Sequence, residues 1–195
     1  MNSPMETIRG AVGRGILTRA DRLFKNDDAG IWTEVLQNAR RAGAHLVEVS
    51  IEEAQSGSSP CILTVRDNGR GIEKFQNLLT LGESGWDSAI QAAEDPAGMG
   101  FFALCHSEIE IHSGDRAVVI GPSVFLGAID AQVLQTSEFI EGTRLRFSRA
   151  STKQALDHAL RRVTEFCPLE VRWRFVSMGR HYRAMTSWPA LCTGN

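Results

Sequence analysis

Glu34 and Asn38, a glutamate and an asparagine four residues apart, are the first side chains whose types and spacing suit a chemical task. At helical spacing the two stack on one face of a helix, and Arg41 extends the same stripe. The amide oxygen of Asn38 can ligate magnesium, and the carboxylate of Glu34 can orient or deprotonate a water molecule. The alternative is that both are solvated side chains on an exposed helix face.

A glycine-rich turn, Asp67-Asn-Gly69-Arg-Gly71-Ile72, follows an apolar stretch directly. The two glycines leave the backbone exposed, so a planar ligand can approach it closely. The carboxylate of Asp67 accepts hydrogen bonds only, which suits the exocyclic amino group of adenine. The alternative is an ordinary Asn-Gly turn between two strands.

Two further glycine motifs lie downstream. Gly98-Met99-Gly100 precedes an apolar run that opens a helix, and the free backbone amides there suit a phosphate group. The alternative for this motif is a glycine hinge. Gly142-Thr143 starts a strand, where the hydroxyl of Thr143 could bind an adenine ring through water.

Motifs of several other sites are missing from the sequence. It contains no P-loop, no complete dinucleotide-binding glycine motif after a strand and no nucleophile elbow. The four cysteines form no C-x-x-C pair and are interpreted as small buried apolar side chains, and the five histidines lack metal-binding spacing.

Composition indicates one globular domain, with room for an appendage. The chain has 195 residues, of which 43% are hydrophobic and 23% charged. No apolar run approaches the ~20 residues of a membrane span. The N-terminus lacks an apolar signal core, so we expect a cytoplasmic protein without a membrane partner.

Charge is distributed unevenly along the chain. The net charge is -2, but residues 1–141 hold 11 Lys or Arg against 20 Asp or Glu, whereas residues 142–195 hold 10 against 3. The basic segment after residue 141 has three interpretations. A nucleic-acid surface is one of them, and a solvated face or a docking face for another domain is favoured over it.

Periodicity and turn residues predict the helices and strands that carry these motifs. Residues 1–27 are expected to form a loose N-terminal arm with one short helix near 18–25. A core at 28–150 begins with a helix at 28–43, which Asp28 caps and Gly43 ends, and it contains a mobile lid at 82–100. An extension at 151–195 begins with a helix capped by Ser151.

The remaining elements of the core and the extension alternate short helices with hairpin-connected strands. Strands are predicted at 45–51, 61–66, 108–112, 117–120, 132–135, 143–147 and 169–176, and short helices at 73–81 and 101–105. This pattern predicts an α+β fold, a two-layer sandwich with helices on one face of a mostly antiparallel sheet.

Taken in order, the four motifs resemble the conserved boxes of the GHKL superfamily of gyrase, ninety-kilodalton heat-shock chaperones, histidine kinases and MutL. The helix segment around Glu34 and Asn38 is similar to the family's E-x-x-x-N box, most closely as found in chaperone-like and MutL-like bacterial members. The resemblance covers about residues 28–148. It implies a Bergerat fold, a mixed sheet backed by helices, with ATP or ADP held between the helices and the lid.

The resemblance also implies a role for each matching residue. Glu34 would be the general base that activates water, and Asn38 would ligate Mg²⁺. Asp67 would recognise the adenine amino group with help from Thr143. The residues implied to line the adenine pocket are Gly69, Gly71 and Ile72, and those implied to contact phosphate from the lid are Gly98, Met99 and Gly100.

The chain departs from the family at one position, where Arg41 replaces the usual aspartate. Glu34 and Asn38 are retained, so the resemblance implies slow Mg²⁺-dependent ATP hydrolysis that drives lid closure and a conformational or dimerisation switch. One alternative is a nucleotide-binding interaction module that does not hydrolyse ATP. Another is a histidine or anti-sigma-type kinase, which usually has asparagine at the position of Glu34. The partners expected are a second copy on ATP binding and a further C-terminal domain or protein.

Overall fold

A computed structural model describes residues 4–11, 15, 18, 24, 26–55, 58–80, 100–176 and 186–187. The predicted lid up to residue 99 and most of the predicted helix near 18–25 lie outside these residues.

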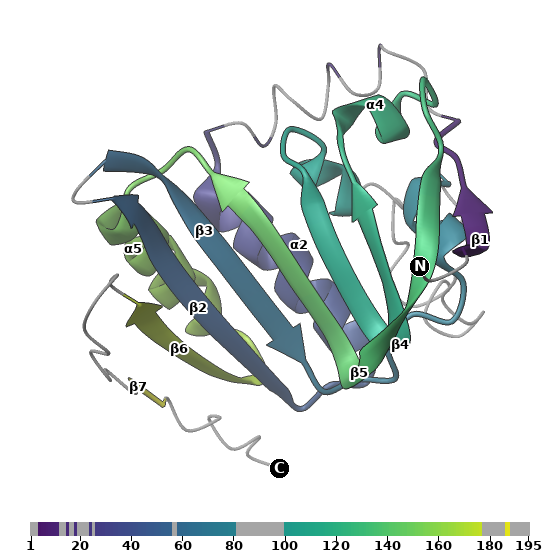
Figure 1. The fold of residues 1–195 in the computed structure, drawn as a ribbon. Helices are drawn as coiled ribbons and strands as arrows, with labels where there is room; N and C mark the ends of the chain where they lie inside the picture. The colour runs from purple at the N-terminus through teal and green to yellow at the C-terminus, as the bar shows by residue number, and fades with distance from the viewer. Residues whose placement is uncertain are drawn as a thin grey trace.

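The described residues form a mixed sheet of seven strands, drawn as arrows in Figure 1. The strands are β1 (Pro4–Ile8), β2 (Leu46–Gln55), β3 (Ser58–Asp67), β4 (Ile109–Ile120), β5 (Ala131–Arg149), β6 (Glu170–Val176) and β7 (Thr186–Ser187). Their order is β1-β5-β3-β2-β6-β7, and β4 pairs with β5 as well. Strands β2 and β6 are parallel, whereas the other described pairs are antiparallel.

Two longer helices lie behind this sheet in Figure 1, α2 (Asp28–Arg41) and α5 (Lys153–Thr164). The shorter described helices are α4 (Pro122–Phe125) and two 3₁₀ turns, η1 (Phe75–Leu79) and η2 (Gly100–Leu104). This architecture confirms the predicted α+β sandwich. Among the described helices, none has the length and apolar character needed to cross a membrane.

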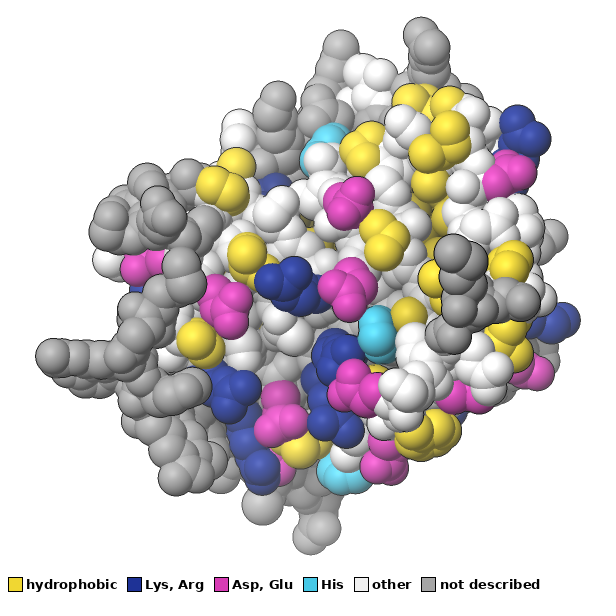
Figure 2. Space-filling view, in the orientation of Figure 1, with side chains coloured by type: hydrophobic (Ala, Val, Ile, Leu, Met, Phe, Trp, Pro, Cys, Tyr) yellow, Lys and Arg dark blue, Asp and Glu magenta, His cyan; other side chains and the backbone are white. Residues whose placement is uncertain are grey.

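The core lies between the helices and the inner face of the sheet. Alternate strand residues such as Val47, Val49 and Leu63 are buried there, as expected for strands covered on one face. Trp32 of α2 is fully buried and donates its indole N–H to the carbonyl of Leu156 in α5 at 3.2 Å. Figure 2 shows the opposite, open face of the sheet, where basic and acidic side chains are interleaved.

The N-terminal arm and both helix caps differ from the sequence prediction. Pro4–Ile8 is not loose but forms β1, which pairs with β5. Asp27, not Asp28, caps α2, because the carboxylate of Asp28 instead accepts from Arg149 at 2.7 Å. Thr152, not Ser151, caps α5. Gly43 does end the first helix, with φ +75°.

The predicted break points in two strands are wrong. β4 and β5 each run without interruption through segments that the sequence divides into two strands. Gly114 has φ +62° and lies at an irregularity in the β4–β5 register, so its glycine marks a bulge and not the end of a strand. Both predicted short helices, at 73–81 and 101–105, are 3₁₀ turns.

Candidate functional site

Three polar side chains lie in one row across the inner face of the sheet. Asp67 on β3 is directly opposite Thr143 on β5, and Thr143 is opposite Ser113 on β4. Thr143 and Ser113 are buried, and Asp67 is half-buried. The inner face is apolar on most of its area, so this row is a polar site within the core.

Asp67 is a desolvated carboxyl group surrounded by hydrogen-bond donors. Burial raises its pKa above the ordinary value, while the backbone N–H of Gly69 and the N–H and hydroxyl of Thr143 counteract this rise. The N–H of Gly69 donates to Oδ1 of Asp67 at 2.8 Å. These donors fix the carboxyl group in one orientation, so that it can accept a further hydrogen bond from a ligand.

The turn after β3 fits tightly against its neighbours. A Cβ atom on Gly69 would come too close to Ala42 at the end of α2. Gly71 has φ +75°, and a Cβ there would overlap the Ser113 hydroxyl. Ile72 follows, half-buried against the core. The two glycines at these positions are therefore required by close packing, and an ordinary Asn-Gly hairpin turn does not account for them.

This turn is also bonded to the end of α2. The carbonyl of Asn38 accepts the N–H of Ala42, and the carbonyl of Ala42 accepts the N–H of Arg70 at 2.9 Å. Oδ1 of Asn68 accepts the N–H groups of His45 and Leu46, each at 3.0 Å. These bonds bring the Asn38 end of the helix and the Asp67 turn into one hydrogen-bonded unit.

Glu34, Asn38 and Arg41 all lie half-buried on α2. Burial raises the pKa of Glu34, and the positive charge of Arg41, seven residues further along the helix, counteracts the rise. Arg41 also donates to Oε1 of Gln37 at 3.4 Å. A carboxyl group with a raised pKa is suited to accept a proton near neutral pH.

Gly142 and Thr143 meet the Asp67 turn from β5. Gly142 has φ +74°, and a Cβ there would overlap the carbonyl oxygen of Asp67. Gly100 is the first residue of η2, which contacts α2. Gly98 and Met99 lie outside the described residues, so the structure assigns them no position.

Ser113 and Arg116 of β4 are site residues that sequence reasoning missed. The predicted strands end at His112 and begin again at Ala117, so both residues fall between two predicted strands. A usable signal is the alternation Ile109, Ile111, Ser113, which continues the inward phase with a polar residue. Ser113 accepts the N–H of Ile72 at 2.8 Å and donates to the carbonyl of Gly142 at 2.8 Å.

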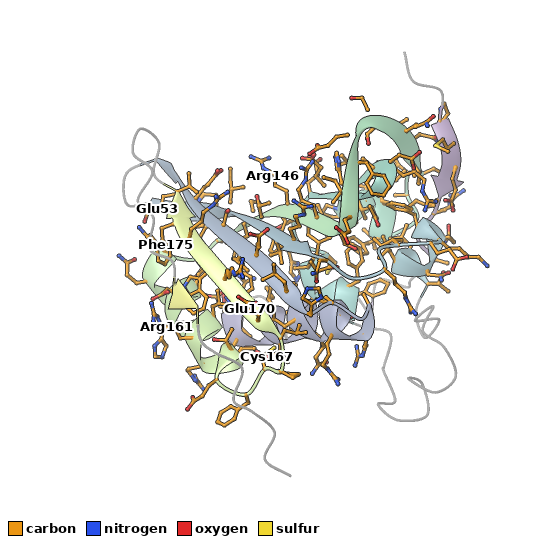
Figure 3. The ribbon with its side chains drawn as sticks, turned by 90° about the horizontal axis from the view of Figure 1, so that it is seen from below. Glu53, Arg146, Arg161, Cys167, Glu170 and Phe175 are labelled. Carbon is orange, nitrogen blue, oxygen red and sulfur yellow. The ribbon has the colours of Figure 1, made fainter. Side chains whose placement is uncertain are left out.

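The charged residues of the open sheet face lie apart from this site. Figure 3 shows Arg146 on the side of the sheet away from α2 and α5. Arg146 lies directly opposite Glu110, and both Arg66 and Arg172 lie opposite Glu48. Such cross-strand pairs stabilise a solvated sheet face.

The donor groups of the site suit only a sparsely ligated metal ion. Among the described residues, no group of three or more His, Cys, Asp or Glu side chains could hold one. Asn38 offers an amide oxygen beside the Glu34 carboxylate. Such a sparse set fits Mg²⁺, which commonly binds through one or two protein ligands, several waters and substrate phosphates.

Comparison with known proteins supports the fold only. No protein-family model matches the sequence, and no curated protein matches it. A solved structure, the N-terminal domain of a DNA repair protein, is similar with a TM-score of 0.51 and 12% identity. The match covers 90% of this chain and 57% of that one, so this chain spans little more than half the length of its structural neighbour.

Proposed function

We propose that this chain binds ATP together with Mg²⁺ and hydrolyses it slowly, as a conformational or dimerisation switch. The proposal rests on the resemblance of its motifs to the GHKL superfamily. The observation that carries it is the row of Asp67 and Thr143 beside a glycine turn that is bonded to the end of the Glu34–Asn38 helix. Motifs that are distant in sequence are thereby adjacent in space.

Asp67 would recognise the base. One of its oxygens accepts the N–H of Gly69, and Thr143 donates to the same carboxyl group. The lone pairs that remain can accept the amino group of adenine, which guanine replaces with a carbonyl oxygen. Gly71 and Ile72 would form the adjoining wall of the pocket, and Gly69 lets the turn pack closely on α2.

Glu34 and Asn38 would act on the phosphate end. Glu34 accepts a proton from the attacking water, for which a pKa raised by burial is suitable. Asn38 would hold Mg²⁺, which when bound neutralises phosphate charge. Gly98, Met99 and Gly100 are the proposed phosphate contacts. Phosphoryl transfer depends mainly on positioning and charge stabilisation, and these few groups supply part of both.

A further domain or partner would complete the enzyme. The structural neighbour is considerably longer than this chain, and in the GHKL branches that the motifs resemble an additional domain contributes a Lys or Arg to the γ-phosphate. We therefore propose a C-terminal domain or protein partner, and a second copy recruited on ATP binding. Closure of the lid would exclude water from the site.

Calorimetric titration of ATP with Mg²⁺ into the chain and into Asp67→Asn tests the proposal, followed by phosphate release from the same samples. We expect binding that Asp67→Asn removes, and slow release that Glu34→Ala stops without removing binding. Absence of binding by the native chain would contradict the proposal. Binding without any release would identify a nucleotide-binding module that does not hydrolyse ATP.

A further inference from the structure

Both backbone polar groups of Ile72 are bound by side chains of a single strand. Its N–H donates to Oγ of Ser113 at 2.8 Å, and its carbonyl accepts from Nη2 of Arg116 at 2.8 Å. Residues three apart in a regular strand point to opposite faces. The irregularity at Gly114, between Ser113 and Arg116, shifts that phase, so both side chains reach the backbone of the same residue, Ile72.

Each of the two side chains also donates a hydrogen bond to a second residue. The Ser113 hydroxyl donates to the carbonyl of Gly142 at 2.8 Å, so it joins the turn after β3 to the start of the Thr143 segment. The guanidinium of Arg116 also donates to the carbonyl of Glu73 at 3.2 Å and lies 5.1 Å from the centre of the Phe75 ring.

We propose that Ser113 and Arg116, which we term the β4 clamp, are positioning residues that set the nucleobase specificity of the site. This inference rests on the proposed ATP binding. The clamp holds Ile72 at a fixed distance from the pair of Asp67 and Thr143. The width of the base pocket therefore depends on one buried hydroxyl and one guanidinium from a strand that carries none of the four motifs.

The physical reason is preorganisation. Asp67 distinguishes adenine from guanine only if the base is held with its amino group at the carboxylate. The opposite wall of the pocket must therefore be fixed before the ligand binds. Ser113 is 3% exposed, and removing its hydroxyl would leave the N–H of Ile72 and the carbonyl of Gly142 without their partner. The turn would then relax, and the advantage of adenine over guanine would fall.

The test measures dissociation constants for ATP and for GTP with Mg²⁺ by calorimetry, on the native chain, Ser113→Ala and Arg116→Met. In both variants ATP affinity is expected to fall about tenfold, the effect of losing the hydrogen bond to Ile72, and GTP affinity to fall less. The ratio of the two affinities therefore drops. Arg116→Lys keeps a charged donor group at this position and is expected to recover part of the loss. Ser148→Ala, an exposed serine on β5, is the control.

A second readout does not need nucleotide. Hydrogen exchange at the Ile72 amide of the free chain is expected to be faster in Ser113→Ala than in the native chain, because its acceptor is gone. A purely structural role would lower the melting temperature of the variants and leave the ATP-to-GTP ratio unchanged.

The outcomes separate the two proposals. If the native chain binds ATP and both variants keep its affinity and its ATP-to-GTP ratio, the role inferred for the β4 clamp is wrong and the proposed function stands. If the native chain binds neither nucleotide, both the proposed function and the role inferred for the β4 clamp are wrong. A lowered ratio in both variants, partly restored in Arg116→Lys, supports the clamp.

Discussion

At the scale of single residues, Glu34 is the group whose environment bears most directly on the proposed chemistry. It lies half-buried on α2, and its pKa is raised by burial against the opposing charge of Arg41. Arg41 stands where the motif that this helix resembles has an aspartate. In the structure it keeps the Glu34 carboxylate more ionised than burial alone would allow.

The pH dependence of hydrolysis follows from these two groups. A general base works only when deprotonated, so the rate should fall as the pH drops through the raised pKa of Glu34. In Arg41→Met the midpoint of the pH–rate profile should move to higher pH, because the positive charge that lowers the pKa of Glu34 is removed. Phosphate release measured over about two pH units on each side of neutrality checks this shift. The exposed Arg40→Met is the control, and an equal shift there would contradict the assignment.

The contribution of Glu34 to the stability of the chain should change with pH in the opposite direction to the rate of hydrolysis. The pKa of Glu34 in the folded chain is raised above the ordinary value of 4.5, so the ionised carboxylate destabilises the folded state at higher pH. This loss of stability disappears as the pH falls to about 4.5 and the carboxyl group becomes protonated. Glu34→Gln should therefore melt at a higher temperature than the native chain at pH 8, and the difference should disappear near pH 4. Thermal unfolding at several pH values measures it. A lower melting temperature for the variant at pH 8 would contradict the burial argument.

Gly142 provides a test of the backbone. Its φ of +74° and the position of the Asp67 carbonyl leave no room for a Cβ. Gly142→Ala should lower the free energy of unfolding by about 1–3 kcal/mol and remove ATP binding. Gly121→Ala is the matched control, because Gly121 has φ -106° and no atom near its missing Cβ. Urea unfolding of both variants gives the comparison, and equal effects would contradict the prediction.

At the scale of elements, α2 is attached to the sheet at both ends. Its C-terminal end is bonded to the Asp67 turn. At its start, Asp28 accepts from Nε of Arg149 at 2.7 Å and from the hydroxyl of Ser151. Glu34 and Asn38 lie between these two attachments, so the helix cannot rotate or slide without breaking one of them.

Removing the attachment at the start of α2 should be costly. Arg149 is 8% exposed, and Arg149→Met would leave the largely buried carboxylate of Asp28 without its charged partner. The free energy of unfolding should fall by about 3 kcal/mol, as measured in urea. Arg146→Met removes an exposed arginine of the same strand and should change it by less than about 0.5 kcal/mol. Similar losses in both would show that the pair does not anchor the helix.

The elements were predictable where periodicity was clean, as in α2 and the β2–β3 hairpin. Their exact caps were not, because Asp27 and Asp28 are equivalent in sequence and only the distant Arg149 distinguishes them. The continuity of β4 was not predicted, because a glycine such as Gly114 is typical of turns, whereas its positive φ here forms a bulge. The roles of Ser113 and Arg116 were not predicted either, because they depend on the strand register that this bulge creates.

At the scale of the whole molecule, the sandwich has a helix-covered face that contains the proposed site and an open face of paired charges (Figures 1 and 2). The basic residues counted after position 141 include Arg144 and Arg172, which form ion pairs with Glu138 and Glu170. Part of the basic charge after position 141 is therefore paired locally on the sheet.

The proposed switch predicts slow turnover. The chain alone should release phosphate at well under about 1 per second, a rate typical of complete enzymes. The rate per chain should rise with protein concentration if ATP recruits a second copy. Phosphate release at several concentrations, with light scattering on the same samples, measures both. Fast turnover by a monomer would show that the chain needs neither a partner nor a further domain.

The proposed ATP site lies between the Asp67 turn, the Thr143 segment and α2. Hydrogen exchange of the chain with and without Mg²⁺ and ATP tests this position. We predict slower exchange at 67–72, at 142–144 and along the half of α2 that contains Asn38, with Asp67→Asn showing no change. Protection confined to the open face of the sheet, or the same protection in Asp67→Asn, would contradict ATP binding at this site.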